Sequence, residues 1–193
     1  MSDTAVTVAV LFAHRQSVYK SMPHCDVYDI DRDARTFQGG VPVVAHPPCR
    51  AWGHLAHFAK PRPDERALST WAVDQVRRWG GVLEHPRASR LWAECALPLG
   101  AAIDAHGGFS LDVNQSWWGH AARKRTLLYI VGITPRELPP MPFSLMLPPK
   151  VLDSRNKAKV RGCHLPKSQR EHTPLHLAQW LCTVARLCRR NAA

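Results

Sequence analysis

The chain of 193 residues is long enough for one domain with a hydrophobic core, and its 45% apolar and 21% charged residues are typical of a globular protein. No run of 18 apolar residues occurs, which excludes a membrane-spanning helix of ordinary length, and the first residues show no basic-then-apolar export signal. The six cysteines have no paired spacing, so we expect free thiols in a reducing cytoplasm.

The formal net charge of +11 is unevenly distributed along the chain. Residues 1–122 hold 12 basic and 12 acidic side chains, whereas residues 123–193 hold 14 basic and three acidic ones. Such a basic segment favours a polyanionic partner, and the seven tryptophans offer surfaces on which bases can stack. The sequence therefore predicts a nucleic-acid partner, DNA first among them, with a solvated basic face as the plainer alternative.

The predicted elements of the first half alternate between strands and helices. Apolar residues 5–13 and the shorter segment 26–31 indicate two strands, and a third follows at 41–45. Apolar side chains at three- and four-residue spacing then predict a helix at 64–79. Acidic residues occupy its first turn and two glycines follow its end, as is typical of helix termini.

The second half begins with a short strand expected at 82–86, after which residues 87–96 are compatible with a helix. A loop containing Gly107 and Gly108 leads to a clear strand at 126–131. Thr173-Pro174 is a typical helix start, so the last helix is expected at 175–187. Two further segments are expected to lack regular structure: extended, proline-rich residues 134–150 and the basic loop 150–172.

This alternation favours a single-domain α/β fold of reduced size, with a mostly parallel, Rossmann-like sheet and flanking helices. Residues 1–150 are expected to form its core. The basic loop would then span 151–172, and residues 173–193 would form a C-terminal helix packed back on the core.

Three segments carry side chains suited to chemistry, each at the end of a predicted strand. In His46-Pro47-Pro48-Cys49-Arg50-Ala51-Trp52 the prolines end the strand and hold Cys49 at its carboxyl end, where open α/β sheets bind ligands. The second segment is Val82-Leu83-Glu84-His85-Pro86. The third runs from Asn114 to Thr126, includes Gln115 and the basic turn Arg123-Lys124-Arg125, and leads into a strand. We expect the three segments to converge on one cleft.

The order of Pro-Pro-Cys, a strand-end Glu-x-Pro and a basic turn into a strand resembles the DNA cytosine-5 methyltransferases, in particular the short phage-type members. The resemblance covers residues 41–132 well and residues 5–31 and 173–187 loosely. It implies a methyltransferase-like sheet and modification of cytosine in DNA with S-adenosylmethionine as cofactor. The target base would have to leave the duplex stack or be single-stranded.

By this resemblance Cys49 is the nucleophile that adds to carbon 6 of the base, which divides one difficult step into two. Glu84 would contact ring nitrogen 3 and the amino group of cytosine. The remaining substrate-binding residues implied by the match are Pro48, Arg50, Arg123, Lys124 and Arg125. The alternatives are a small buried cysteine, a structural ion pair of Glu84 and a solvated basic turn.

The cofactor half of the resemblance is weaker than the substrate half. The family has a glycine-rich turn after its first strand, where the backbone approaches the cofactor, but no glycine follows Phe12 here before position 39. Phe12 matches the aromatic residue after the family's first strand, and either Asp29 or Asp31 would match the acid that binds the ribose hydroxyls. Arg15 and Ser17 of the intervening loop complete the candidate cofactor-binding positions. We therefore expect an incomplete S-adenosylmethionine pocket. The altered loop would instead be lined by Arg15, Ser17, Tyr19 and Lys20, whose side chains suit an anion.

Eleven histidines raise the question of a metal site. His54 and His57 follow the Cys49 turn, and His172 and His176 are four residues apart near a predicted helix start. Neither Cys-x-x-Cys nor His-Glu-x-x-His spacing occurs, so no metal is expected.

Three functions remain open from the sequence. The leading expectation is a DNA pyrimidine-modifying enzyme, a cytosine-5 methyltransferase-like transferase. The alternatives are a non-catalytic nucleic-acid-binding protein with the same fold and an enzyme that acts on free pyrimidine nucleotides.

Overall fold

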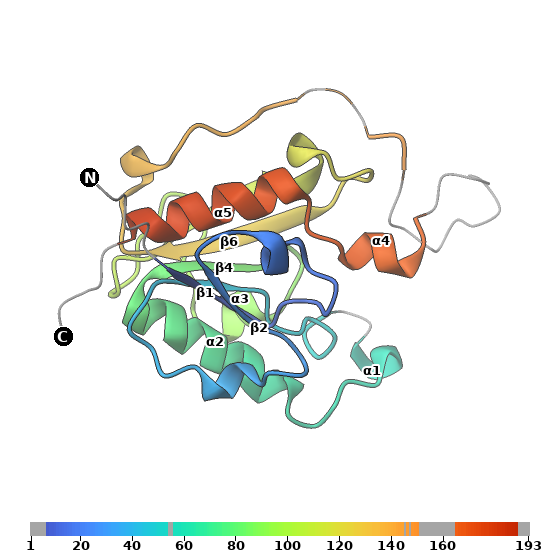
Figure 1. Ribbon diagram of the computed structural model, residues 1–193, viewed down its shortest axis with the longest axis horizontal. Helices are drawn as coiled ribbons and strands as arrows, with labels where there is room; N and C mark the ends of the chain where they lie inside the picture. The colour runs from blue at the N-terminus through green and yellow to red at the C-terminus, as the bar shows by residue number, and fades with distance from the viewer. Residues whose placement is uncertain (1–6, 54–55, 145, 147, 151–164, 189–193) are drawn as a thin grey trace.

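The computed structural model describes residues 7–53, 56–144, 146, 148–150 and 165–188 (Figure 1). A single sheet of six strands lies at its centre, in the order β2-β1-β3-β4-β6-β5. The strands are β1 (Val8–Leu11), β2 (Cys25–Tyr28), β3 (Val43–Ala45), β4 (Gly81–Pro86), β5 (Phe109–Asn114) and β6 (Arg125–Val131).

The sheet is mixed, because its two halves pair differently. β1 pairs in parallel with β2 and β3, and β3 pairs in parallel with β4. β6 is antiparallel to both β4 and β5, so β6 alone runs against the other five strands. The expected mostly parallel sheet is therefore wrong, since the chain turns back as a hairpin at one edge instead of continuing through another crossover.

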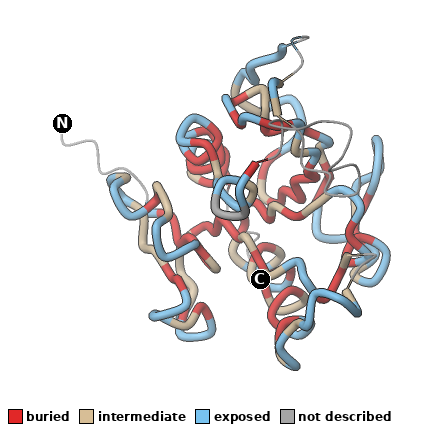
Figure 2. Tube along the Cα trace, turned by 90° about the vertical axis from the view of Figure 1, so that its right-hand side faces the viewer, coloured by how far each residue is buried: buried red, intermediate tan, exposed pale blue. Residues whose placement is uncertain are grey.

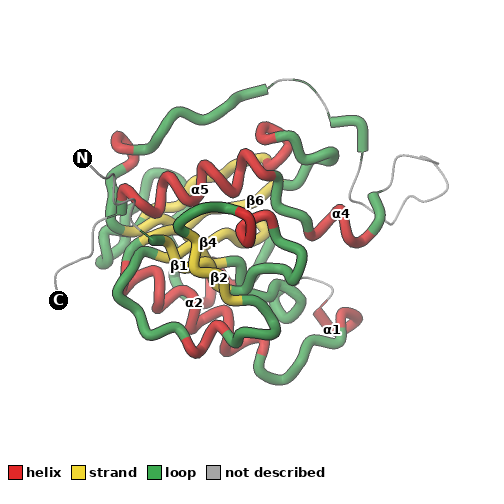
Figure 3. Tube along the Cα trace, viewed as in Figure 1, coloured by secondary structure: helices red, strands yellow, loops and turns green. Residues whose placement is uncertain are grey.

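Both faces of the central strands are buried because a helix covers each side (Figures 1 and 3). Val8 and Val10 of β1 face α5 (Leu175–Leu187), whereas Ala9 and Leu11 face α2 (Glu65–Trp79). This period-two alternation gives two apolar cores, one on each face of the sheet. Figure 2 shows the buried residues following the sheet and its covering helices, with exposed residues in the connecting loops.

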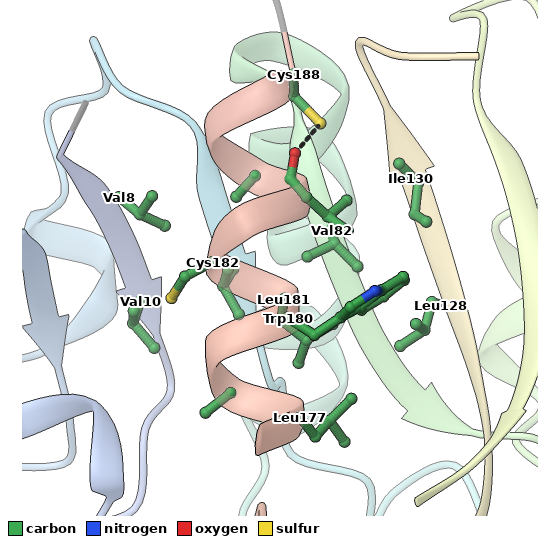
Figure 4. Packing of buried hydrophobic residues seen from close by; sticks show 14 of the residues in the cluster. Val8, Val10, Val82, Leu128, Ile130, Leu177, Trp180, Leu181, Cys182 and Cys188 are labelled. Carbon is green, nitrogen blue, oxygen red and sulfur yellow. Dashed lines mark hydrogen bonds between the residues drawn. The ribbon is translucent and has the colours of Figure 1, made fainter. Parts of the chain in front are cut away.

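The side chains that α5 presents to the sheet lie against β1, β4 and β6 (Figure 4). Leu177, Leu181 and Val184 are fully buried there. Trp180 packs against Trp118 with ring centroids 5.5 Å apart, and its indole Nε1 donates to the carbonyl oxygen of Pro140 at 3.1 Å. The C-terminal helix is thus an integral part of the core.

Glycine is required at the first position of β4. Gly81 has φ of +122°, and a Cβ atom there would stand 2.0 Å from the backbone oxygen of Val43. The pair Gly80-Gly81, expected from the sequence to end α2, therefore also allows β4 to lie directly beside β3.

Most predicted elements are present with shifted ends. The helix expected at 87–96 is limited to α3 (Leu91–Glu94), and short helices occur at α1 (Ala56–Ala59) and α4 (Lys167–Glu171). Four 3-10 turns complete the described elements: η1 (Val18–Ser21), η2 (Ala34–Thr36), η3 (Gln115–Trp118) and η4 (Pro135–Glu137).

Two expectations about loops are wrong. The segment after Gly107-Gly108 is not only a loop, because it contains the edge strand β5. The basic segment expected to lack structure contains α4 near its end, while residues 151–164 of that segment lie outside the described residues.

Candidate functional site

The predicted chemical segments meet at the carboxyl ends of β1, β3 and β4. The chain forms β2 on one side of β1 and then crosses to form β3 on the other side, which makes the β1–β3 boundary the topological switch point of the sheet. Ligands of open α/β sheets bind outside the strand ends at such a point. Because β6 is antiparallel, its beginning lies at the same edge as the end of β4.

Glu84 is the centre of the polar network at this edge. Its Oε2 lies 3.0 Å from Nδ1 of His46, and its Oε1 accepts from Nε2 of Gln115 at 3.1 Å and from the Thr126 hydroxyl. The side chain of Glu84 is only 11% exposed, so these bonds replace most of the water that the carboxylate would otherwise bind.

A second hydrogen bond extends this network towards η1. The hydroxyl of Tyr19 lies 3.0 Å from Nε2 of His46, on the opposite side of the imidazole ring from Glu84. Burial, with the charge of Glu84 adding to it, holds the pKa of Tyr19 well above its usual value, so the hydroxyl keeps its proton and donates. His46 then donates from Nδ1 to Glu84, while its Nε2 accepts from the Tyr19 hydroxyl.

Glu84 is ionised in this network. Burial favours the protonated acid, but the hydrogen bond from His46, the charge of Lys124 and the Thr126 hydroxyl together hold its pKa well below the ordinary value.

His85, the next residue of β4, differs from Glu84, because burial lowers the pKa of His85 to about 4 and keeps its ring neutral. Both ring nitrogens of His85 are buried without a hydrogen-bond partner, and the ring packs edge-on against Trp92.

Cys49 is exposed at the turn after β3. Partial desolvation of the thiol and the negative charge of Glu84 raise the pKa of Cys49, while the positive charge of Lys124 opposes this shift. The thiol is thus accessible to a ligand and protonated at neutral pH. Nucleophilic attack from Cys49 requires that a proton leave the sulfur first.

The basic residues expected to bind substrate divide into two groups. Lys124 is half-buried, and its charge acts on both Cys49 and Glu84, while its neighbour Arg123 is exposed.

Arg125 instead pairs with Asp112 of β5 at 2.6 Å, and Arg50 pairs with the buried carboxylate of Glu65 at the start of α2. Pro48 lies in the same turn, where its carbonyl oxygen accepts from the Ser69 hydroxyl at 2.9 Å.

We expect Arg50→Ala to lower stability and to leave ligand binding unchanged. The Glu65 side chain is 1% exposed, and without Arg50 its remaining cation is Arg62 at 3.5 Å. Since Arg50 is half exposed, the loss in unfolding free energy should be about 1–2 kcal/mol, measured by chemical denaturation. Arg123→Ala is the exposed control. Unchanged stability together with weaker nucleotide binding would show that Arg50 serves the ligand.

The positions expected to bind the cofactor are largely engaged by the protein itself. Asp29 pairs with Lys20 at 2.5 Å and accepts the backbone N–H groups of Asp31 and Arg32. The bond from Lys20 and those N–H groups lower its pKa to about 2. Asp31 forms an exposed pair with Arg15 at 2.6 Å.

The turn after β1 is equally occupied. Phe12 adopts the left-handed φ of +63° that glycine would favour and packs edge-on against Trp71. Ser17 caps η1, whose Tyr19 is buried behind the end of β1. These residues do not fit an adenosyl cofactor bound against the β1 turn. The two acids that would bind its ribose are paired with Lys20 and Arg15, and Phe12 occupies the turn where the backbone would approach the cofactor.

A hollow of about 350 Å³ lies beside the Cys49 edge, between η3, α4 and the start of α5. Its walls include Trp118, His120, Leu165, Gln169, His172 and His176. The hollow lies at the same edge of the sheet as Glu84, because η3 begins at Gln115, whose side chain donates to Glu84. Its volume falls in the range of small-ligand pockets. No cluster of metal-ligating side chains occurs among the residues that the structure describes.

Sequence reasoning missed four contributors to this site. His46, Gln115 and Thr126 belong to the three chemical segments but received no role, and Tyr19 was considered only as part of an anion-binding loop. The position of His46 directly before Pro-Pro-Cys was the available signal, because it places the ring at the same strand end as Cys49.

Comparisons of the chain with protein-family models, with characterised proteins and with solved structures gave no match. Within the described part of the chain, every helix is too short or too polar to span a membrane.

Proposed function

We propose that the protein activates a cytosine base by covalent catalysis, with Cys49 as nucleophile and Glu84 as the group that recognises the base. The observation that carries this proposal is the position of an accessible thiol beside an ionised, hydrogen-bonded carboxylate at the switch point of the sheet. The proposal also rests on the resemblance of the three motifs to cytosine-5 methyltransferases.

The chemistry begins when Cys49 loses its proton to solvent and the resulting thiolate sulfur bonds to carbon 6 of the ring. The electron pair of the 5,6 double bond moves to carbon 5, which becomes nucleophilic and takes up a proton or another electrophile. Removal of a proton from carbon 5 then restores the double bond and expels the thiolate. No step needs a methyl donor, so the base-activating half-reaction stands apart from the cofactor question.

Glu84 gives the site a preference for cytosine. A carboxylate has about four acceptor positions, and His46, Gln115 and Thr126 occupy three of them. The remaining position suits the exocyclic amino group of cytosine, which donates hydrogen bonds. The oxygen that uracil carries at the same ring position would be repelled by this carboxylate.

The form in which the base arrives is part of the proposal. The basic excess of residues 123–193 favours DNA, with the base outside the stack. The neighbouring hollow, whose walls include Trp118 and the exposed imidazoles of His172 and His176, favours an unpaired nucleotide held by stacking and polar contacts. We therefore propose single-stranded DNA as the substrate, with a free nucleotide as the second candidate on account of this hollow.

The exchange of the hydrogen at carbon 5 tests the proposal without any cofactor. In D₂O the protein should place deuterium at carbon 5 of cytosine in a single-stranded oligonucleotide, detected as a mass increase after digestion. Because the pKa of Cys49 is raised, the rate should still increase above about pH 8.5, where an ordinary cysteine is half ionised. Uracil oligonucleotide, duplex DNA and cytidine monophosphate complete the comparison. Absence of deuterium from all four substrates would overturn the proposal.

A further inference from the structure

Two cysteines far apart in the sequence lie side by side on the α5 face of the sheet. Cys25 is the first residue of β2, and Cys182 lies in the middle of α5. Their Sγ atoms are 3.6 Å apart although 157 positions separate them in the chain. In Figure 4, Cys182 points from α5 towards Val8 and Val10 of β1, the strand that pairs with β2.

The two thiols differ in access and in acidity. Cys25 is half-buried, whereas Cys182 is fully buried. A hydrogen bond from the Cys182 thiol, assisted by the charge of Arg186, lowers the pKa of Cys25 to about 7 against the opposing effect of burial. The same hydrogen bond and burial raise the pKa of Cys182. Cys25 therefore has the properties of an attacking thiolate, and Cys182 those of a protonated partner held in reach.

The other described cysteines lack this arrangement. Cys49 and Cys95 have raised pKa values, mainly because of desolvation. Among the described residues, neither thiol lies within hydrogen-bond distance of another sulfur. Cys188 is buried, its thiol donates to the Val184 carbonyl oxygen, and burial raises its pKa to about 12. Among the cysteines that the structure describes, Cys25 alone combines access, a lowered pKa and a second thiol.

We propose that Cys25 and Cys182 form a modification site: a reversible disulfide that a peroxide generates between β2 and α5. The Cys25 thiolate attacks one peroxide oxygen, which gives a sulfenic acid and releases hydroxide. The Cys182 sulfur then attacks the sulfenic sulfur and loses its proton, and the second oxygen leaves as water. Two thiols and one hydrogen peroxide thus give one disulfide and two waters. The sulfurs must approach by about 1.5 Å to reach bonding distance.

The disulfide has a direct structural consequence. β2 is an edge strand that pairs in the sheet with β1 alone, and the new bond would tie it to the C-terminal helix. The η1 turn packs against both elements, and its Tyr19 donates to His46 of the candidate site. The modification would therefore stiffen the support of that site. The disulfide would form whatever reaction the candidate site performs.

Peptide mapping of the peroxide-treated protein tests this inference. Reduced full-length protein is treated at pH 7 with one equivalent of hydrogen peroxide, unfolded, alkylated and digested. We expect a cross-linked peptide pair containing Cys25 and Cys182, two hydrogen atoms lighter than the reduced pair and cleaved by dithiothreitol. Cys49, Cys95 and Cys188 should remain alkylated, and Cys25 should react at least about tenfold faster than Cys95 because of its larger thiolate fraction.

Two variants separate the steps. Cys182→Ser removes the resolving thiol, so sulfenic acid should accumulate on Cys25 and be trapped by dimedone. Cys25→Ser should leave Cys182 unmodified, and Cys95→Ser, which removes another half-buried thiol, should behave as the wild type. The oxidised wild type should also unfold at a higher temperature than the reduced form, because the bond closes a long loop.

The inference is overturned if Cys25 and Cys182 are alkylated as fully after peroxide as before it. It is equally overturned if Cys25 in the wild type stops at sulfenic acid, or if Cys25 pairs with a different cysteine.

Discussion

Cys49→Ser should reduce deuterium exchange at carbon 5 of cytosine by on the order of 10³-fold or more, the scale seen when a covalent nucleophile is removed. A serine hydroxyl has the shape of the thiol but ionises far less readily and cannot form the adduct at neutral pH. Because Cys49 is exposed, the substitution should leave the thermal unfolding of the protein unchanged. The measurement is the initial exchange rate in D₂O by mass spectrometry.

The matched control is Cys95→Ser, which removes a thiol from the α2 face of the sheet and should retain the wild-type exchange rate. Exchange that survives in Cys49→Ser would show that the reacting group lies elsewhere. Exchange lost equally in both variants would indicate damage to the fold and not to the chemistry.

Glu84→Gln should have the second-largest effect, because three hydrogen-bond donors converge on this carboxylate. Glutamine offers one oxygen and one amide nitrogen, so at least one of these donors loses its acceptor. We expect a loss of about 1–3 kcal/mol in unfolding free energy. We also expect roughly 100-fold slower exchange on cytosine and a smaller preference for cytosine over uracil.

The control for Glu84→Gln is Glu94→Gln, in which an exposed glutamate loses its pair with Arg66. Surface pairs of this kind contribute little, so neither stability nor exchange should change measurably. An unchanged cytosine preference in Glu84→Gln would contradict the proposed recognition of the amino group, even if the rate fell.

The stability difference between the wild type and Glu84→Gln should also depend on pH. The folded pKa of Glu84 lies below the unfolded value, so its stabilising effect is complete above the unfolded pKa of about 4.3. As pH falls below that value, the unfolded chain takes up the proton and the effect declines. Denaturation curves at pH 7 and pH 3.5 should therefore show the two proteins converging at the lower pH.

Much of the fold could be predicted because its central strands are continuous apolar runs between glycines and prolines. β1, β3, β4 and β6, together with α2 and α5, lie at or near their expected positions. β5 was missed although its sequence Phe-Ser-Leu-Asp-Val-Asn alternates strictly between apolar and polar residues, because it follows a glycine turn and contains Asp and Asn, which are depleted in strands. Without β5, the antiparallel half of the sheet could not be foreseen.

The candidate site was predictable at the level of segments but not of partners. Strand ends place Cys49 and Glu84 at one edge of the sheet, as the sequence suggested. The bond from Thr126 to Glu84 depends on the antiparallel register of β4 and β6, which no local pattern reveals. Likewise, the charges of Arg50 and Arg125 suggested substrate contacts, but each is paired with an acid from a distant segment.

Bond formation between Cys49 and carbon 6 of a pyrimidine is the central step of the proposed catalysis. An oligonucleotide containing 5-azacytosine tests this directly, because its additional ring nitrogen makes carbon 6 more electrophilic and no methyl donor is needed. We predict a protein–oligonucleotide adduct in the intact mass spectrum, with the modified peptide mapping to Cys49 and no adduct in Cys49→Ser. Folded wild-type protein that forms no adduct, or forms it equally at Cys95, would contradict the account.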